Sequence, residues 1–330
     1  MKAYVLHGVG DLRYEDVPVP EIGPGWALIR VLAAGICSSD IPRIFEKGTY
    51  HFPTIPGHEF CGVVEKVHDR EDESWAGKRV GVYPLIPCKK CASCLKGEYE
   101  TCSSYDYTGS RRDGAFAEYV AVPVWNLIEL PDTVSDIEGA MLEPLSVALH
   151  AVKKLGGIEG KSVCIVGTGP IGMMAGQWAK ALGARAVVKG RSEAKREIAE
   201  RSGLEYVTET DGEFDCVVEV VGSPEAVAES ISLAKPGGRL VLIGNPSGDI
   251  PLAQDVYWKI LRRQQTLCGT WNSSFKGGDS DWAASVRALA EGSIRVEGLC
   301  SHVMGAAELP RGLAIMRDRT EPYGKIIVRG

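Results

Sequence analysis

From Lys161 onward, short apolar runs alternate with stretches that favour helices. In order, these segments are KSVCIVG, PIGMMAGQWAKALG, RAVVKG, SEAKREIAERSG, DCVVEVVG, PEAVAESISLAK and GRLVLIG. Strands that alternate with helices in this way form a parallel sheet with helices on both faces. We therefore expect a doubly wound α/β domain, and residues 266–271 could supply its last strand.

The first 140 residues have a different character. They contain short β-like runs at 26–32, 61–67, 79–83 and 116–122, separated by Gly and Pro turns. This pattern is typical of an irregular β-rich domain. Beyond the α/β part we expect a helix over 281–291 and a terminal strand in YGKIIVRG. A chain of 330 residues is long enough for two domains with separate cores.

A glycine motif directly follows the apolar strand that ends at Val166 and directly precedes a helix. Glycine-rich turns also occur without ligands. In this context the first glycine permits a tight turn, the second lets backbone approach a pyrophosphate, and the third allows close packing of helix on strand. The N-terminus of the helix offers free N–H groups to the diphosphate. The motif predicts a dinucleotide site at Gly167, Gly169, Pro170, Ile171 and Gly172.

The residues that select between NAD(H) and NADP(H) are expected at the end of the second strand of this domain. An acidic residue there would bind the ribose 2′-hydroxyl and repel a 2′-phosphate. The chain has Lys189, Gly190, Arg191 and Ser192 at this point, with no carboxylate. We therefore predict NADP(H) over NAD(H), with Gly190, Arg191 and Ser192 as contacts. The alternative is that Lys189 and Arg191 are only solvated surface charges.

Four cysteines, Cys88, Cys91, Cys94 and Cys102, form a CxxCxxCx7C run. Thiolates at this spacing can close a tetrahedral zinc site, which makes a structural site the expectation. An iron–sulfur cluster is the main alternative, but such runs usually place the next cysteine after three residues and follow it with proline. Disulfides are disfavoured because the chain opens MKAYVLHG, without a signal peptide, and its ten cysteines suit a reducing, cytoplasmic compartment.

Composition limits the remaining classes of function. The chain is 45% hydrophobic and 24% charged, which is ordinary for a globular enzyme. Its net charge of −6 gives no reason to expect a nucleic-acid partner, which calls for a basic face. No apolar stretch reaches the length of a spanning helix, so no membrane partner is expected.

Several segments together resemble one enzyme family. GICSSD, IPGHEFCGVVEKV, the four-cysteine run, EPLSVALHA and GTGPIG occur in the order found in zinc-dependent medium-chain alcohol dehydrogenases, over essentially the whole chain. SDIPRIFEKGTYHFPTIPGHEF, YTGSRRDGAFAEY and KILRRQQTLCGTWNSS resemble its polyol branch, including enzymes of polyol phosphates. The resemblance implies a GroES-like catalytic domain over 1–142 and 275–330, a Rossmann domain over 143–274, and a homodimer or homotetramer.

The resemblance also implies an open, catalytic zinc site. By position its ligands are Cys37, His58 and Glu143, with Glu59 as an alternate or neighbouring carboxylate. Cysteine, histidine and carboxylate are a suitable mixed ligand set for zinc. The expected chemistry is Lewis-acid polarisation of an alcohol oxygen, with hydride transfer to the nicotinamide ring. Two zinc ions per chain are therefore expected.

In this family a hydroxyl two residues after the cysteine moves the alcohol proton, and that position is Ser39. Many relatives pass the proton to a histidine, but here the corresponding residue is Pro42, which has no titratable group. His51, or a water held by Glu59 or Glu143, is our hypothesis for the missing step. Further cofactor contacts are expected at Lys195, Val221, Gly222, Ile243, Gly244, Thr270, Trp271 and Lys325.

A phosphate on the polyol would need cations, and guanidinium groups match phosphate oxygens in a bidentate way. The candidates are Arg43, Lys47, Arg111 and Arg112, while Trp271, Asn272 and Ser273 are expected to line another wall. The alternative is that Arg111 and Arg112 form salt bridges with Asp106, Asp113 or Glu118.

Other functions remain open. A free polyol or an amino polyol is the alternative substrate, as in sorbitol or threonine dehydrogenases. A zinc-free quinone or enoyl reductase, or a non-catalytic NADP-binding protein, is less favoured because such proteins do not need an open zinc site.

Overall fold

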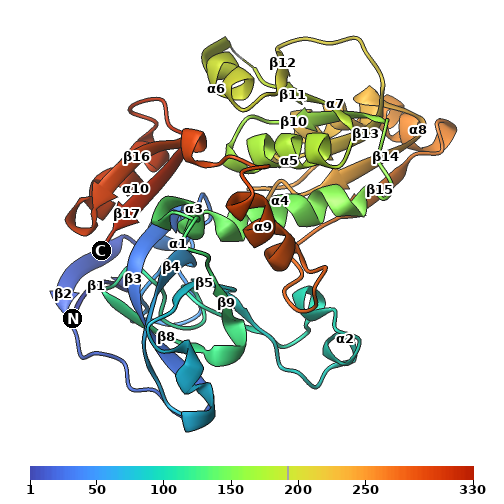
Figure 1. The fold of residues 1–330 in the computed structure, drawn as a ribbon. Helices are drawn as coiled ribbons and strands as arrows, with labels where there is room; N and C mark the ends of the chain where they lie inside the picture. Colours follow the sequence, from blue (N-terminus) through green and yellow to red (C-terminus); the bar gives the residue numbers. More distant parts are fainter. Residues whose placement is uncertain (192) are drawn as a thin grey trace. The chain divides into compact units, whose positions relative to one another are not determined.

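The computed structural model describes residues 1–191 and 193–330, which form two compact units (Figure 1). Unit 1 comprises Met1–Glu143, Ser274–Ala290 and Cys300–Gly330, and unit 2 comprises Pro144–Ser273 and Glu291–Leu299. The expected division assigns all of 275–330 to the catalytic domain, whereas the compact units place Glu291–Leu299 in unit 2.

Unit 2 is built on a six-stranded parallel sheet of order β12-β11-β10-β13-β14-β15. The direction of winding reverses between β10 and β13, which is where dinucleotides bind in such sheets. This confirms the doubly wound fold. Its strands are β10 (Ser162–Val166), β11 (Arg185–Lys189), β12 (Glu205–Val207), β13 (Phe214–Glu219), β14 (Ala234–Leu242) and β15 (Thr266–Gly269). Its helices are α5 (Pro170–Ala181), η4 (Glu193–Lys195), α6 (Arg196–Arg201), α7 (Pro224–Leu233), α8 (Gln254–Arg262) and η5 (Glu297–Leu299).

The central strands of unit 2 are nearly continuous apolar runs because helices cover the parallel sheet. Cys164, Val217 and Leu240 are fully buried and share a core with Ile231 of α7. Helix α7 begins with Pro224 after Ser223, whose side chain accepts a hydrogen bond from Ala226 N. Both residues fit a helix start, since proline has no N–H to leave unpaired and serine caps one free donor.

Unit 1 contains a seven-stranded sheet in which β16, β17, β3, β4, β5 and β9 follow one another and β8 pairs with β3. Its strands are β1 (Lys2–Gly8), β2 (Asp11–Asp16), β3 (Trp26–Ile36), β4 (Glu59–Val67), β5 (Arg79–Val82), β6 (Leu85–Ile86), β7 (Asp106–Tyr107), β8 (Tyr119–Pro123), β9 (Leu127–Glu129), β16 (Cys300–Gly305) and β17 (Lys325–Arg329). Its helices are α1 (Asp40–Phe45), η1 (Arg70–Trp75), α2 (Ala92–Leu95), η2 (Tyr99–Thr101), η3 (Val124–Asn126), α3 (Asp136–Ala140), α9 (Asp281–Ala290), η6 (Ala306–Glu308) and α10 (Leu309–Asp318). Helix α4 (Leu142–Lys154) begins in unit 1 and continues in unit 2.

The expected strands of the first domain, the helix near 281 and the terminal strand are all present. Within 193–203, the described part of the stretch expected to be helical, the α-helix comprises Arg196–Arg201. Over the described residues, no helix combines the length and apolar character needed to cross a bilayer.

Strand pairing in unit 1 brings three distant segments together. The antiparallel register pairs Gly35 of β3 with Glu59 of β4, and Ile36 of β3 with Ile326 of β17. The end of β3 and the starts of β4 and β17 therefore meet at one place. Gly35 is needed there, because an added Cβ would lie 2.5 Å from the Glu59 carboxylate and 2.8 Å from Lys325 Cε.

Candidate functional site

Cys37, His58 and Glu59 converge at this meeting point in unit 1. Each offers one ligand atom, and these atoms all lie within 4.8 Å of one another. His58 and Glu59 are buried, at 4% and 2% exposed. His58 Nδ1 is a buried polar atom for which the described residues supply no hydrogen-bond partner. A thiolate, an imidazole and a carboxylate around one centre fit a zinc ion.

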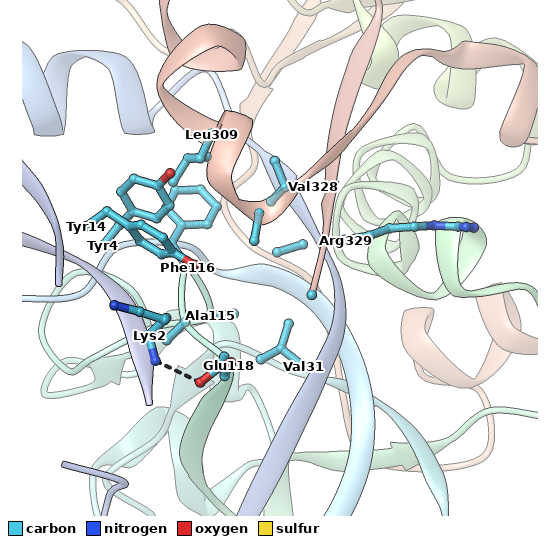
Figure 2. Close-up of a pocket in the computed structure, with 14 residues that line it drawn as sticks. Lys2, Tyr4, Tyr14, Val31, Ala115, Phe116, Glu118, Leu309, Val328 and Arg329 are labelled. Carbon is cyan, nitrogen blue, oxygen red and sulfur yellow. Dashed lines mark hydrogen bonds between the residues drawn. The ribbon is translucent and has the colours of Figure 1, made fainter. Parts of the chain in front are cut away.

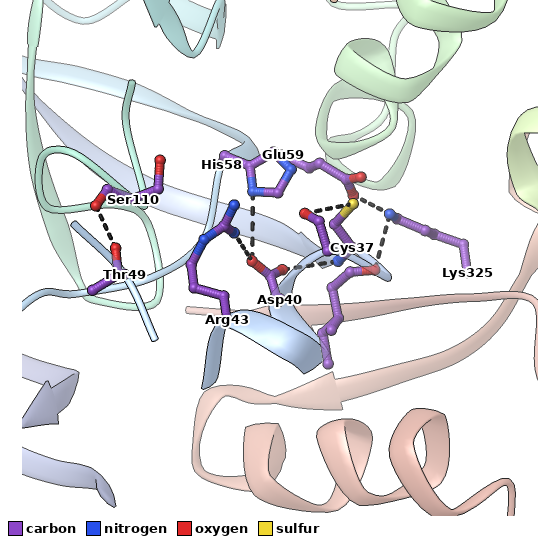
Figure 3. Close-up of polar contacts among 10 residues, drawn as sticks. Cys37, Asp40, Arg43, Thr49, His58, Glu59, Ser110 and Lys325 are labelled. Carbon is purple, nitrogen blue, oxygen red and sulfur yellow. Dashed lines mark hydrogen bonds and ion pairs between the residues drawn. The ribbon is translucent and has the colours of Figure 1, made fainter. Parts of the chain in front are cut away.

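Asp40 supports this cluster from the first turn of α1. Its Oδ2 accepts a hydrogen bond from Cys37 N at 2.9 Å, and its Oδ1 accepts one from Arg43 Nη1 at 2.9 Å. Oδ1 also lies 3.6 Å from His58 Nδ1 (Figure 3). Asp40 is fully buried, which by itself would raise the pKa of its carboxyl, but His58 and Arg43 lower that pKa below its ordinary value. Sequence reasoning missed Asp40, although an acid three residues after a ligand cysteine was an available signal.

Lys325 provides a second buried charge beside the cluster. Its Nζ pairs with Glu59 Oε2 and donates a hydrogen bond to Ile36 O at 3.0 Å. Burial acts to lower the pKa of Lys325, but Glu59 and Cys37 raise it above its ordinary value. We expected Lys325 to contact the cofactor. Its ammonium is already engaged by Glu59, and the cofactor contact stays a prediction.

Ser39 and Glu143 lie near the three converging residues. Ser39 Oγ donates a hydrogen bond to Cys37 Sγ at 3.3 Å. Glu143 is 8% exposed, and burial raises its pKa to about 7, while His58 opposes this shift. Among the described residues, the close three-residue group contains Glu59 and does not contain Glu143. Zinc ligation by Glu143 and proton transfer by Ser39 stay predictions.

His51 lies in an exposed loop outside this group. Its Nδ1 lies 3.1 Å from Pro53 O, and its Nε2 lies 3.0 Å from Arg111 O. Thr54 Oγ1 is also 3.0 Å from Nδ1. Both ring nitrogens are therefore engaged, and a relay through His51 would require the ring to give up one of these contacts.

The four-cysteine run forms a second potential metal centre. The four sulfur atoms lie within 4.8 Å of one another, with Cys88 Sγ 4.0 Å from Cys94 Sγ and Cys91 Sγ 3.9 Å from Cys102 Sγ. Zn–S bonds of about 2.3 Å give tetrahedron edges of about 3.8 Å, close to these separations. Backbone N–H groups of Cys94 and Ser103 lower the pKa of Cys91 to about 5, which favours a thiolate. All ten cysteines are free thiols.

In unit 2 the glycine motif has the geometry that its sequence predicts. Gly167 has φ +122°, a conformation that other residues rarely adopt. A Cβ at Gly172 would collide with Gly167 O, whereas one at Gly169 would meet no atom within 4 Å. Gly169 is therefore open toward solvent at the N-cap of α5, with Pro170 at the first helical position. Gly167 and Gly172 serve the turn and the packing, and Gly169 leaves room for a phosphate.

In the turn after β11, the two expected cations have different surroundings. Lys189 Nζ pairs with Glu229 Oε1 at 2.7 Å and donates a hydrogen bond to Thr208 O at 3.0 Å. Lys189 is thus neutralised within unit 2, which corrects the expectation of two available cations. Arg191 is exposed, and Gly190 has no room for a Cβ beside Tyr206. Ser192 lies outside the described residues.

A buried carboxylate that sequence reasoning missed organises the end of β13. Glu219 Oε1 accepts hydrogen bonds from Val221 N at 2.7 Å and Gly222 N at 2.8 Å. The backbone oxygen of Glu219 accepts bonds from Ile243 N and Gly244 N. These four expected cofactor residues therefore lie together at the carboxyl edge of the sheet. An acid at the end of the apolar run DCVVE was the available signal.

The remaining predicted residues are distributed between the two units. In unit 2, Lys195 is partly buried, Thr270 N bonds Leu242 O, and Trp271 is 58% exposed. Asn272 has φ +56°, and Ser273 is 1% exposed. In unit 1, Arg112 forms an ion pair with Asp106. The salt-bridge alternative therefore holds for Arg112.

A separate cavity of about 140 Å³ lies in unit 1 (Figure 2). Its lining includes Tyr4, Tyr14, Phe116, Leu309 and Val328. It contains none of the residues predicted for the site, and its mainly apolar lining offers no metal-ligand set.

Comparisons with known proteins agree with this geometry. Residues 23–132 match the alcohol dehydrogenase GroES-like domain, and residues 170–291 match the zinc-binding dehydrogenase family. The chain is 34% identical over 319 residues to galactitol 1-phosphate 5-dehydrogenase of Escherichia coli (strain K12), covering 92% of each protein. A crystal structure of galactitol-1-phosphate dehydrogenase from Escherichia coli matches with a TM-score of 0.92 and 32% identity over all of both chains.

Two further similarities concern substrate and cofactor. Sorbitol dehydrogenase of Bacillus subtilis (strain 168) is 33% identical over 273 residues, covering 76% of this chain and 77% of that protein. A putative zinc-binding dehydrogenase from Sinorhizobium meliloti 1021, solved bound to NADP, matches with a TM-score of 0.89 and 30% identity over 100% of this chain and 99% of the other.

Proposed function

Because the chain belongs to the zinc-dependent medium-chain alcohol dehydrogenase family, we propose that it transfers a hydride between NADP(H) and a secondary alcohol or ketone of a polyol or polyol phosphate. The chain is an oxidoreductase that acts on a small-molecule alcohol. The observation that carries the proposal is the convergence of Cys37, His58 and Glu59 within 4.8 Å. The relatives that act on galactitol 1-phosphate and on sorbitol support the polyol class.

The metal centre is proposed to hold one zinc ion through Cys37, His58 and a carboxylate of Glu59 or Glu143. A bound zinc supplies Lewis-acid polarisation of an alcohol or carbonyl oxygen. The chain's own residues position the ligands and move the proton. Asp40 holds the Cys37 backbone and faces His58, which fixes the orientation of both ligands. The second zinc ion is assigned to the four-cysteine lobe.

Ser39 is proposed to accept the alcohol proton at Oγ during oxidation and to return it during reduction. Its hydroxyl already lies within hydrogen-bond distance of Cys37 Sγ. Because Pro42 cannot continue the transfer, the proton must leave through another group. A water held by Glu59 or Glu143 is our preferred route, and His51 is the alternative.

NADP(H) is the proposed cofactor because the turn after β11 has a cation and no carboxylate. After the pairing of Lys189 with Glu229, Arg191 is the residue proposed to meet a 2′-phosphate. The similar protein solved with NADP supports this choice. A clear preference for NAD(H) in kcat/KM would overturn it.

We also propose a cytoplasmic homodimer or homotetramer. Ten cysteines outside any disulfide fit a reducing compartment. Strand β15 forms an edge of the unit 2 sheet, and the neighbouring α8 exposes Tyr257, Trp258 and Leu261. Light scattering measures the oligomeric state directly.

A decisive test combines metal analysis with a substrate panel. We expect two zinc ions per chain after dialysis, and oxidation of polyols or their phosphates with NADP. Ser39→Ala should keep both zinc ions and lose about 100-fold or more in kcat. One zinc ion or none per chain, with activity on quinones or enoyl substrates, would instead indicate the reductase alternative, which has no catalytic zinc.

A further inference from the structure

Three arginines were candidates for an anionic group of the substrate, and the structure distinguishes them. Arg43 donates to the buried carboxylate of Asp40 at 2.9 Å. Arg112 is paired with Asp106. Arg111 takes part in no ion pair among the described residues. Its guanidinium is therefore the one candidate of the three whose charge is not already matched by a contacting carboxylate.

Two tyrosines hold the Arg111 guanidinium in place. Its Cζ lies 4.3 Å from the ring centroids of both Tyr50 and Tyr105. Nη1 donates to Tyr105 O at 2.8 Å, and Nη2 donates to Tyr50 Oη at 3.3 Å. Aromatic stacking orients the planar fork but leaves its charge intact. The side chain is thus held in one place with its full positive charge.

Arg111 makes fewer hydrogen bonds within the described residues than its guanidinium can donate. A guanidinium has five N–H donors, and the two bonds to Tyr105 and Tyr50 account for two of them. Nε is buried without an acceptor among the described residues. Unmade hydrogen bonds of a buried donor are costly. Nη1 and Nη2 each keep one further N–H, and an anion at this end of the guanidinium would accept hydrogen bonds from both.

The loop that carries Arg111 is fixed to the backbone that carries His58. Gly114 N donates to Ile55 O at 2.7 Å, and Ala115 N donates to Gly57 O at 2.9 Å. A Cβ at Gly109 would lie 2.5 Å from Gly57 O, so the two backbones are in direct contact. Gly57 immediately precedes His58. Arg111 therefore has a fixed position relative to the metal centre within unit 1.

Contacts from residues 49 and 51 also hold this loop in place. Thr49 Oγ1 donates to Ser110 O at 2.5 Å, as Figure 3 shows beside His58 and Arg43. His51 Nε2 contacts Arg111 O at 3.0 Å. A series of ring contacts connects the arginine with the metal centre. The ring centroids of Tyr105 and Tyr107 are 6.2 Å apart, and those of Tyr107 and His58 are 5.8 Å apart.

We propose that Arg111, clamped between Tyr50 and Tyr105, is a subsite for the phosphate monoester of a phosphorylated polyol. This inference rests on the proposed function and selects the phosphorylated substrate over the free polyol. The two remaining N–H groups on Nη1 and Nη2 suit bidentate contact with two oxygens of a phosphate monoester. A carbon chain would then extend from Arg111 toward the cluster that includes His58.

The test compares a hexitol 1-phosphate with the free hexitol in the zinc-loaded enzyme. Arg111→Gln should lower kcat/KM for the phosphate by about 10- to 100-fold, mainly through KM, because charge-assisted hydrogen bonds are lost. The free hexitol should lose much less than the phosphate, because it has no phosphate for Arg111 to bind. Arg111→Lys should recover part of the loss, since it keeps the charge without the fork.

Arg30→Gln removes an exposed arginine of unit 1, whose partner Glu65 is also exposed, and should leave the phosphate preference unchanged. If Arg112→Gln abolishes the preference instead, the assignment to Arg111 is wrong. An equal loss with free and phosphorylated hexitol in Arg111→Gln also refutes it. A preference for sugar acids over phosphates would overturn the assignment to a phosphate.

Inorganic phosphate gives a measurement that does not depend on the stability of a variant. It should inhibit oxidation of free hexitol competitively in the wild type. Activity on free polyols without such inhibition would remove the subsite but leave the proposed function standing. A zinc-loaded wild type that oxidises no polyol, free or phosphorylated, would instead remove the proposed function.

Discussion

The buried ion pair between Lys325 and Glu59 makes a quantitative prediction about stability. The Lys325 and Glu59 side chains are 5% and 2% exposed, so water cannot compensate either charge when its partner is removed. Lys325→Met keeps most of the apolar volume but deletes the ammonium. Glu59 would then be buried without its cation, and Ile36 O would lose its donor.

Breaking a buried ion pair by removing one partner costs about 3–5 kcal/mol. In a unit of this size each kcal/mol lowers Tm by about 2–4 °C, which gives a loss of about 6–20 °C for unit 1. The loss should be smaller in zinc-loaded protein, because a metal cation beside Glu59 would supply the missing positive charge. Lys2→Met is the matched control. Its partner Asp16 is 75% exposed, so the expected cost is below about 1 kcal/mol.

Urea unfolding with and without a zinc chelator, followed by tryptophan fluorescence, measures these differences. Trp282 is 1% exposed in unit 1 and reports on its packing. The double variant Lys325→Met/Glu59→Gln should recover much of the stability, since neither charge is then left alone. If chelated Lys325→Met lies within about 1 kcal/mol of the control, or if the double variant recovers nothing, the reasoning from burial fails.

Three further predictions concern other parts of the chain. Gly190→Ala would press a Cβ against the Tyr206 hydroxyl and against Thr168 Cγ2. It should destabilise unit 2 by about 1–3 kcal/mol and weaken NADP binding, with partial rescue by Tyr206→Phe, which removes the nearest atom; normal binding in calorimetry would contradict this. Cys94→Ser should remove one zinc ion per chain by metal analysis and expose the lobe 88–102 to proteases; retention of both ions would be contrary. Hydrogen bonds from the Ser162 N–H and hydroxyl lower the pKa of Asp215 to about 2. Its stabilising effect should therefore be complete above the unfolded pKa of about 3.9 and disappear as pH falls through about 2. Asp215→Asn should cost about 1 kcal/mol at pH 7, after allowance for its 34% exposure, and progressively less in acid; a constant difference across this range would count against it.

The sequence was sufficient where local pattern determines structure. The run KSVCIVGTGPIG specifies a strand, a turn and a helix, and Gly167 and Gly172 have the turn and packing geometry that their spacing predicts. The four cysteines lie within fifteen residues, so their convergence could be anticipated without knowledge of the fold.

Contacts between distant segments could not be predicted in the same way. Residues 59 and 325 are neighbours only because β17 pairs with β3 and β3 pairs with β4. No local pattern encodes that register, so the sequence alone gives no sign of the ion pair between Lys325 and Glu59. Asp40 and Glu219 were missed for a related reason, since an acidic residue usually lies on the surface and only the fold reveals its burial.

The close contact between Gly57, Gly109 and Gly114 affects how this enzyme can be altered. Added Cβ atoms at Gly109 or Gly114 would run into the backbone of Gly57, one residue before His58. A transplanted loop from a relative would therefore have to carry both glycines, or it would displace the imidazole along with the arginine. Changes of substrate range in this chain are best sought by exchanging side chains on the existing loop, at Arg111 and Tyr50, rather than by changing its length.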